Sequence, residues 1–272
     1  MVPSPDRIQT LSTLALLTKY TRFRRPLYFA FTHNPSHKPP RAHWVLRDAM
    51  AHISPLKYSQ AMTAGRTWVQ AFRDDKITRY GWDFSSFGKI RFAIREYLLG
   101  ALFAVWIARK RVITADEGRS LAVATLPQKS TLSTHLLDIA SLLIDCFLRL
   151  IQPRKGIKRA QVCNSRIRDL VIKTLGEKKV KSMVNLNLLA VVPELRGRGH
   201  GKALLQAVTK MADEYERGTW LVSVNVENTK LYEAHGFKTI GEVTVADDND
   251  ADWKEGPILV YVMVREPESP KE

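Results

Sequence analysis

The feature that most constrains this chain is a glycine-rich segment between an apolar run and a helix-forming sequence, VVPELRGRGHGKALLQAV at residues 191–208. Gly197, Gly199 and Gly201 fall within five residues, and helix formers follow at once. A strand, a glycine loop and a helix start together predict a site for an anionic group. The first backbone N–H groups of a helix lack internal partners, and the helix dipole favours negative charge there. Glycine lets the backbone approach such a group without an intervening Cβ.

The spacing of the glycines distinguishes between known anion-binding loops. A Walker loop needs Gly-x-x-x-x-Gly-Lys followed by Ser or Thr, but Ala203 follows Lys202, and Arg196 stands where the first glycine belongs. The dinucleotide fingerprint Gly-x-Gly-x-x-Gly needs its third glycine one residue later than Gly201. The pattern that fits is Arg-x-x-Gly-x-Gly, which begins at Arg196 and is preceded by AVVPE.

This pattern resembles the GNAT superfamily of acetyl-CoA-dependent N-acetyltransferases, in which a strand reading L-x-V-x-P leads into such a loop and helix. LLAVVPELRGRGHGKALL follows it almost residue for residue. The later segment SVNVENTKLYEAHGFKTIGEV is similar to the family's second signature, and YVMVREP is similar to its last strand. The resemblance covers residues 184–265, whereas residues 1–100 and 129–182 match no family pattern.

The resemblance implies that the amides of residues 197–202 hold the pyrophosphate of coenzyme A, while Arg196 and Arg198 add positive charge. The strand before the loop is expected to splay from its neighbour and to offer backbone groups to the pantetheine arm. The implied coenzyme-binding residues are Leu189, Ala190, Val191, Arg196, Gly197, Arg198, Gly199, His200, Gly201, Lys202, Asn225 and Asn228. The alternatives are a tight turn for the glycines, solvated surface charges for the arginines and a helix N-cap for Asn228.

The implied reaction is direct attack of a primary amine on acetyl-CoA, without a covalent enzyme intermediate and without a metal. Tyr232 matches the family tyrosine that protonates the leaving thiolate, and the alternative for it is a core aromatic. Many relatives use a carboxylate on or near the strand before the loop as the base, but this strand offers only Asn185 and Asn187. The carboxylates that could act through water are Asp138, Asp145 and Glu227.

The sequence predicts one α/β domain over residues 1–272, with a mixed, mostly antiparallel central sheet flanked by helices. Its expected parts are a helical N-terminal part at 1–100, a strand hairpin at 102–127, a helical insert at 129–182 and a coenzyme-binding core at 183–266. The hairpin combines LFAVWIARK at 102–110 with SLAVATLP at 120–127.

Within the insert, residues 131–152 form the clearest helix, and Pro153 ends it. Because its polar positions make one narrow stripe, we expect this helix to bury most of its surface. A membrane-surface helix is the alternative, and the acids in the polar stripe argue against it. Residues 153–182 are expected to form a basic connector.

The charge of the chain is distributed unevenly. The net charge is +15, and residues 1–190 hold 32 Lys and Arg against 12 Asp and Glu. Such a balance favours anionic partners, which are nucleotides, phosphorylated cofactors, nucleic acid or an acidic membrane surface. Nucleic acid is not favoured, because the bases lack the regular aromatic interleaving of single-strand binders. Two rival functions stay open. One is an acyl-CoA-binding module without catalysis, which the missing base supports, and the other is a basic nucleic-acid-associated protein, which the charge of residues 1–190 suggests.

The expected partners are acetyl-CoA and an amine acceptor that is a small molecule or a peptide. Cys146 and Cys163 have no metal-ligand spacing, and no apolar run is long enough to form a transmembrane segment. We expect a cytoplasmic protein, with the mitochondrion or the nucleus as alternatives. The segment 1–46 weakly resembles a mitochondrial presequence, since it holds seven bases and a single acid, Asp6.

Overall fold

The computed structural model describes residues 52–82, 88–127, 132–224, 226–247 and 252–268. The predictions for residues 1–51, which include the targeting segment at 1–46, lie outside these residues. The division of the whole chain into a single domain stays a prediction.

The described residues form a seven-stranded mixed sheet with strand order β1-β2-β3-β4-β5-β7-β6. Only β4 and β5 are parallel, and every other neighbouring pair is antiparallel. The strands are β1 (Ser54–Pro55), β2 (Arg111–Ala115), β3 (Ser120–Thr125), β4 (Val184–Val191), β5 (Thr219–Ser223), β6 (Lys238–Val245) and β7 (Ile258–Arg265). The predicted fold class is therefore confirmed.

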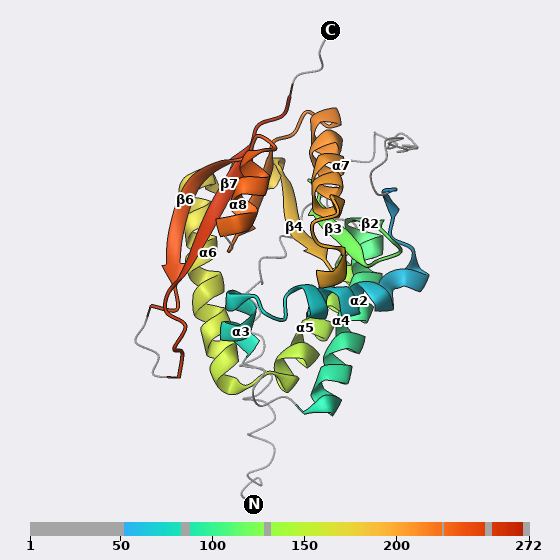
Figure 1. Ribbon diagram of the computed structural model, residues 1–272, viewed down its shortest axis with the longest axis vertical. Helices are drawn as coiled ribbons and strands as arrows, with labels where there is room; N and C mark the ends of the chain where they lie inside the picture. The colour runs from blue at the N-terminus through green and yellow to red at the C-terminus, as the bar shows by residue number, and fades with distance from the viewer. Residues whose placement is uncertain (1–51, 83–87, 128–131, 225, 248–251, 269–272) are drawn as a thin grey trace, which may run out of the picture. The chain divides into compact units, whose positions relative to one another are not determined.

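Helices flank this sheet, and the apolar face of α7 packs against it to form the main hydrophobic core. Figure 1 shows α7 beside β3 and β4, and α6 behind β6 and β7. The helices are α2 (Ala61–Ala71), α3 (Lys76–Trp82), α4 (Lys89–Arg109), α5 (Leu132–Ile151), α6 (Arg154–Ser182), α7 (His200–Glu214) and α8 (Val226–Glu233), with short 3₁₀ turns η1 (Tyr58–Gln60) and η3 (Pro193–Leu195). Leu204, Leu205 and Val208 of α7 are fully buried in a core cluster with the sheet. Their spacing is that of one helix face, which is why the apolar run after the glycine loop folds onto the sheet.

A β-bulge at Asn187 divides β4 into two halves. Val123 and Ala124 of β3 pair with Leu188 and Leu186, so that Asn187 has no partner in the ladder. A bulge shifts the alternation of side chains by one residue. Leu186 belongs to the core cluster beneath α7, and beyond the bulge it is Leu189, not Leu188, that packs against the same cluster. The bulge thus turns the side chains of Asn187 and Leu188 to the opposite face of the sheet.

The first strand of the predicted hairpin was wrong, because residues 102–109 form the end of helix α4. The buried side chains of this part are Leu99, Leu102, Phe103 and Trp106. Leu102, Phe103 and Trp106 follow Leu99 by three, four and seven residues. This is the spacing of one helix face rather than the alternation of a strand. The hairpin itself consists of β2 and β3 with a turn at residues 116–119.

The basic connector predicted at 153–182 was also wrong, since these residues form helix α6 with a kink at Gly176. Its buried positions include Arg159, Cys163, Ile167 and Val171, which repeat every four residues. A stripe with this period packs one face of a helix, while the lysines of α6 remain in solvent. The surrounding basic residues concealed this apolar stripe in the sequence.

Helix α5 confirms the predicted helix at 131–152 but not the burial expected of it. Leu148 is buried, whereas Leu136, Ile139, Leu143, Phe147 and Leu150 are exposed. Asp138 lies on the inward side and pairs with Arg109 of α4, with Nε to Oδ1 at 3.1 Å. The polar stripe of α5 therefore faces the protein. No helix among the described residues is long and apolar enough to cross a membrane.

A buried ion pair joins β7 to α7. The guanidinium of Arg265, whose side chain is only 6% exposed, donates to both carboxylate oxygens of Asp213 at 2.6 and 2.9 Å. The hydrogen bond to Asp213 is the main cause that raises the pKa of Arg265 above its ordinary value.

We expect Asp213→Ala to lower the free energy of unfolding by about 3 kcal/mol, because it leaves a buried charge without its main partner. Urea denaturation measures this loss. The control Glu177→Ala removes the exposed Glu177–Lys181 pair and should cost less than about 0.5 kcal/mol; equal losses in both variants would contradict the argument.

Candidate functional site

Strands β4 and β5 separate beyond their first residues and leave one edge of β4 open. Their parallel pairing extends only over Val184–Leu186 and Thr219–Leu221. In the part of the chain that the structure describes, residues 188–191 of β4 pair with β3 but not with β5, and the bulge residue Asn187 pairs with neither strand. Unpaired N–H and C=O groups on a strand edge can bind an extended ligand as a further strand would. Leu189, Ala190 and Val191 lie on this edge, and their role in binding the coenzyme stays a prediction.

The glycine loop lies at the end of this open edge. Gly197 and Gly199 have φ of 73° and 82°, and Gly199 is the N-cap of α7. A left-handed backbone explains why both positions are glycine. A Cβ at either position would meet no atom within 4 Å, so the space in front of the loop is open. The amide of Ala203 donates to the Gly199 carbonyl, and the earlier N–H groups of the helix are left to bind an anion.

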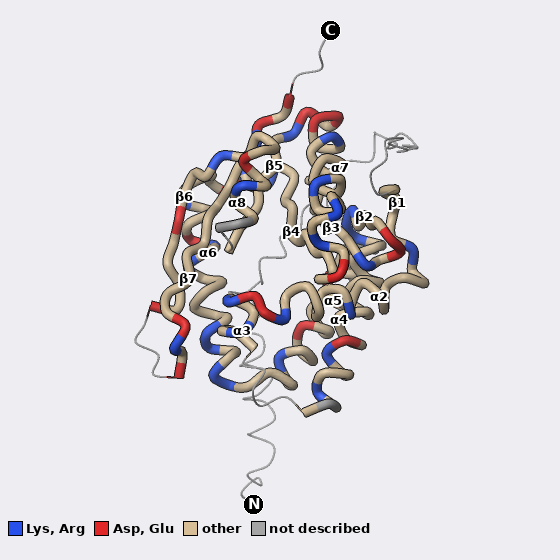
Figure 2. Tube along the Cα trace, in the orientation of Figure 1, with Lys and Arg blue, Asp and Glu red and all other residues tan. Residues whose placement is uncertain are grey.

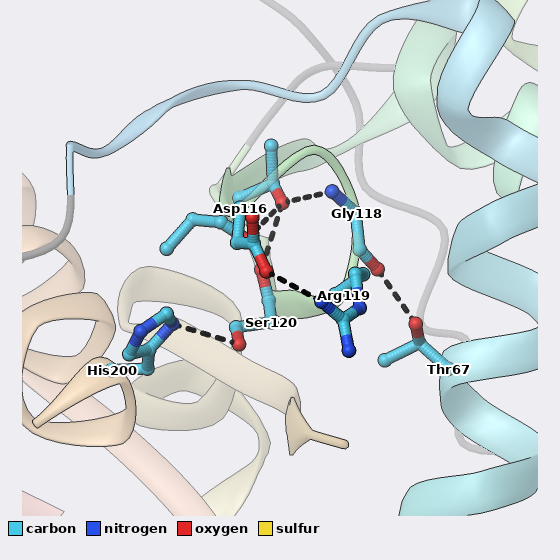
Figure 3. A network of polar contacts seen from close by, with 8 residues as sticks. Thr67, Asp116, Gly118, Arg119, Ser120 and His200 are labelled. Carbon is cyan, nitrogen blue, oxygen red and sulfur yellow. Dashed lines mark hydrogen bonds and ion pairs between the residues drawn. The ribbon is translucent and has the colours of Figure 1, made fainter. Parts of the chain in front are cut away.

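A network of hydrogen bonds fixes the start of α7 to the β2–β3 hairpin (Figure 3). His200 Nδ1 lies 3.0 Å from Oγ of the buried Ser120, and the hairpin carbonyl of Gly118 accepts from Thr67 Oγ1 of α2 at 2.7 Å. The backbone N–H of Val192, where the loop begins, donates to the carbonyl of Arg119 at 3.1 Å. The His200 ring thus serves as an anchor, and its amide is the group left for a ligand.

One charged residue of the loop, Arg196, binds a neighbouring helix, and two others, Arg198 and Lys202, extend into solvent. Arg196 Nη2 donates to the carbonyl of Ala71 at 2.8 Å. Ala71 is the last residue of α2, where helix carbonyls lack intrahelical partners. Arg196 therefore ties the loop to α2. Arg198 and Lys202 are exposed beside the glycines.

Tyr232 lies on α8 and points into the core. It is 8% exposed, and its ring meets Phe237 edge-on with centroids 6.0 Å apart. Burial raises the pKa of the Tyr232 phenol to about 12, so the hydroxyl stays protonated over the ordinary pH range. The core-aromatic interpretation and the proton-donor interpretation of Tyr232 both fit this geometry.

The second signature contains two candidate coenzyme-binding asparagines, Asn225 and Asn228. Asn225 lies outside the described residues. Asn228 is an exposed residue in the first turn of α8, which begins at Val226. Asn228 is therefore not the N-cap that the alternative interpretation assigned to it. The side chain of Glu227, a candidate base, also lies outside the description.

A polar cluster lies at the β4 bulge, next to the C-terminal end of α4. Lys110 Nζ lies 3.4 Å from Oδ1 of Asn187, and Thr125 Oγ1 donates a short hydrogen bond to the same oxygen. Lys110 also stacks over the Trp106 ring, with its Nζ 4.4 Å from the ring centroid. The cluster therefore links the side chain of Lys110 to Asn187, the first residue of β4 that no longer pairs with β5.

Two carboxylates of α5 face this cluster. Burial lowers the pKa of the Lys110 ammonium to about 7, with a further lowering by Arg109 and opposing effects of Asp145 and Asp138. Burial raises the pKa of Asp145 to about 6, against the opposing charges of Arg149 and Lys110. Both groups thus titrate near neutral pH, which is typical of residues that exchange protons. Within the described ranges, no group of three His, Cys, Asp or Glu side chains is placed to hold a metal ion.

Sequence reasoning found Asp138 and Asp145 but not Lys110. Lys110 was assigned to a strand, since residues 102–110 were interpreted as half of a hairpin. The signal that could have found it is the helical spacing from Leu99 to Trp106, which places Lys110 just after the end of α4.

Comparisons with known proteins agree with the motif analysis. Residues 158–239 match the family model described as "Acetyltransferase (GNAT) domain", so the resemblance inferred from the sequence is confirmed. No curated protein matches the chain significantly.

Among solved structures, the chain is similar to "histone acetyltransferase HPA2 and related acetyltransferase" of Corynebacterium glutamicum, at 18% identity, with 82% of this chain and 99% of that chain covered and a TM-score of 0.48. Polyamine N-acetyltransferase of Drosophila melanogaster is 16% identical, with 79% and 98% covered and a TM-score of 0.49. Arylalkylamine N-acetyltransferase 2 of Aedes aegypti is 10% identical, with 80% and 99% covered and a TM-score of 0.49.

Proposed function

Because residues 158–239 match the model of the GNAT acetyltransferase domain, we propose that this protein transfers an acetyl group from acetyl-CoA to a primary amine. The domain supports acyl transfer in general; the choice of acetyl-CoA and of an amine acceptor, a small molecule or a peptide, is our proposal. The observation that carries it is the continuity between the open edge of β4 at residues 187–191 and the glycine loop at its end.

We propose that the loop and the strand edge bind the two parts of coenzyme A separately. The N–H groups of residues 197–202 hold the pyrophosphate, because no side chain blocks the loop at Gly197 or Gly199. Arg198 and Lys202 add charge beside it. The backbone of Leu189, Ala190 and Val191 bonds the pantetheine arm as a neighbouring strand would. This arrangement directs the thioester toward the bulge at Asn187.

The chemistry requires that the amine lose protons and that the sulfur gain one. The neutral amine attacks the thioester carbonyl carbon, a C–N bond forms, and the C–S bond breaks. Tyr232 donates its phenolic proton to the departing sulfur, and water returns to the phenol the proton that the attacking nitrogen releases. Burial keeps Tyr232 protonated until negative charge develops on sulfur.

Lys110 is the group that we assign to the first deprotonation. Its amine contacts Asn187 at the bulge and is neutral above about pH 7. It can therefore accept a proton from the ammonium form of the acceptor, and Asp145 then faces the charged lysine across the α4–α5 contact. In this scheme Asp145 is a positioning residue, which tunes Lys110 without touching the substrate.

The pH profile tests this pair. As a base, Lys110 must be neutral, so kcat/KM should rise through about pH 7 in the native protein. Because the charge of Asp145 raises the pKa of Lys110, Asp145→Asn should move this rise to lower pH by about 0.5. The matched control is Asp169→Asn, which removes an exposed carboxylate of α6 and should leave the profile unchanged. A profile that is the same in all three proteins would exclude the pair from the reaction.

Two measurements test the function itself. Calorimetry of the full chain with acetyl-CoA should give micromolar binding, and release of free CoA thiol in the presence of a panel of primary amines should reveal transfer. Binding without thiol release from any amine would favour the rival interpretation of an acyl-CoA-binding module. Absence of binding would overturn the proposal.

A further inference from the structure

Helix α5 presents a continuous apolar face to solvent. The exposed fractions are 63% for Leu136, 53% for Ile139, 55% for Leu143, 56% for Phe147 and 78% for Leu150. These positions recur at intervals of three and four residues, which places them along one side of the helix. Large apolar side chains gathered in this way mark an interaction surface more often than singly scattered ones do.

The acids of α5 are turned away from this face. Asp138 pairs with Arg109, and Asp145 faces Lys110. From residue 135 to the end of the helix, every side chain with an exposed position is apolar, neutral or basic, and none is acidic. The objection that the sequence raised against a membrane-surface helix, namely its acidic stripe, therefore does not apply to the exposed side.

Basic residues follow the apolar face at its C-terminal end. Arg149 is exposed on the last turn of α5, and Arg154 and Lys158 are exposed on the first turns of α6. Figure 2 shows the Lys and Arg positions gathered at this end of α6. An apolar stripe bordered by bases is complementary to a lipid surface that carries negative headgroups.

We propose that α5 docks its exposed apolar face on an anionic lipid surface. The Leu, Ile and Phe side chains enter the boundary between headgroups and acyl chains, and the bases at the end of α5 and the start of α6 bind the headgroup phosphates. The helix lies in the plane of the membrane and does not cross it. This inference goes beyond the proposed function and does not depend on it.

Vesicle sedimentation tests the proposal with the full chain. We expect the wild type to sediment with vesicles that contain phosphatidylserine and much less with pure phosphatidylcholine vesicles, and to be released by salt. Leu143→Glu combined with Phe147→Glu should lower the partition coefficient at least about tenfold. Both positions are exposed, so the double variant should fold normally, and circular dichroism checks this.

A matched control separates the apolar face from net charge. Tyr215→Glu combined with Leu259→Glu makes the same charge change at two exposed apolar positions elsewhere, which are 39% and 41% exposed. It should bind vesicles nearly as well as the wild type. Cys146 is exposed on α5 while Cys163 is buried, so an environment-sensitive dye on Cys146 should shift to the blue on anionic vesicles.

Three outcomes would overturn the proposal. The first is a wild type that sediments with neither kind of vesicle at low salt. The second is an equal loss of binding in the control variant, which would assign the effect to net charge alone. The third is concentration-dependent association in light scattering that Leu143→Glu with Phe147→Glu removes, since a second copy of the chain would then cover the face.

Discussion

Replacing Gly199 by Trp should lower the affinity for acetyl-CoA at least about a hundredfold, which corresponds to about 2.7 kcal/mol. Gly199 caps α7 with φ at 82°, and a Cβ built there meets no protein atom within 4 Å. The indole therefore enters the space in front of the helix start, where the pyrophosphate would contact the backbone N–H groups. Calorimetric titration of wild type and variant with acetyl-CoA measures the loss.

Backbone strain is the competing explanation for such a loss, and Gly256 controls for it. Its φ is 74°, and a Cβ there also meets nothing within 4 Å. Gly256→Trp thus imposes a similar strain, about 1–2 kcal/mol, in the loop between β6 and β7. It should bind acetyl-CoA like the wild type. Unchanged affinity in Gly199→Trp would show that the glycine loop is only a turn.

Tyr232→Phe should lower kcat about a hundredfold while the affinity for acetyl-CoA stays the same. The substitution removes the hydroxyl and keeps the ring that packs edge-on against Phe237. The fold should therefore be retained, and the change should affect only proton transfer to sulfur. Steady-state rates of thiol release and calorimetric binding separate the two effects.

Tyr261→Phe is the matched control, because Tyr261 of β7 packs against the same core cluster. It should leave kcat nearly unchanged. If Tyr232→Phe also leaves kcat unchanged, Tyr232 is a core aromatic, and the leaving thiolate takes its proton from solvent. If both variants lose activity together with thermal stability, the loss comes from packing.

The part of the site that could be predicted from the sequence is the part built from contiguous residues. The strand before the loop, the positions of Gly197 and Gly199 and the helix that follows were all predicted within a few residues. Local chemistry determines them, since a left-handed turn requires glycine and an amphipathic helix requires an apolar stripe. The order of β5, α8, β6 and β7 followed from the second signature for the same reason.

The second helix of the insert, α6, could not be located in this way. The sequence of α6 carries a helical apolar stripe at Cys163, Ile167 and Val171, but the many bases around it outweighed that signal. The end of α4 was interpreted as a strand because its apolar run is short, and a short run does not distinguish a buried helix from a strand.

The sequence by itself determined the strand before the glycine loop, the left-handed glycines of that loop and the helix after it, because each depends on the conformation of neighbouring residues. The tertiary structure alone decided which face of α5 meets solvent and what surrounds Lys110. The sequence gives α5 one narrow polar stripe, and folding directs that stripe inward because Arg109 and Lys110 lie beneath it. The pairing of Arg109 on α4 with Asp138 on α5 joins residues 29 positions apart, which is beyond the reach of any local sequence pattern.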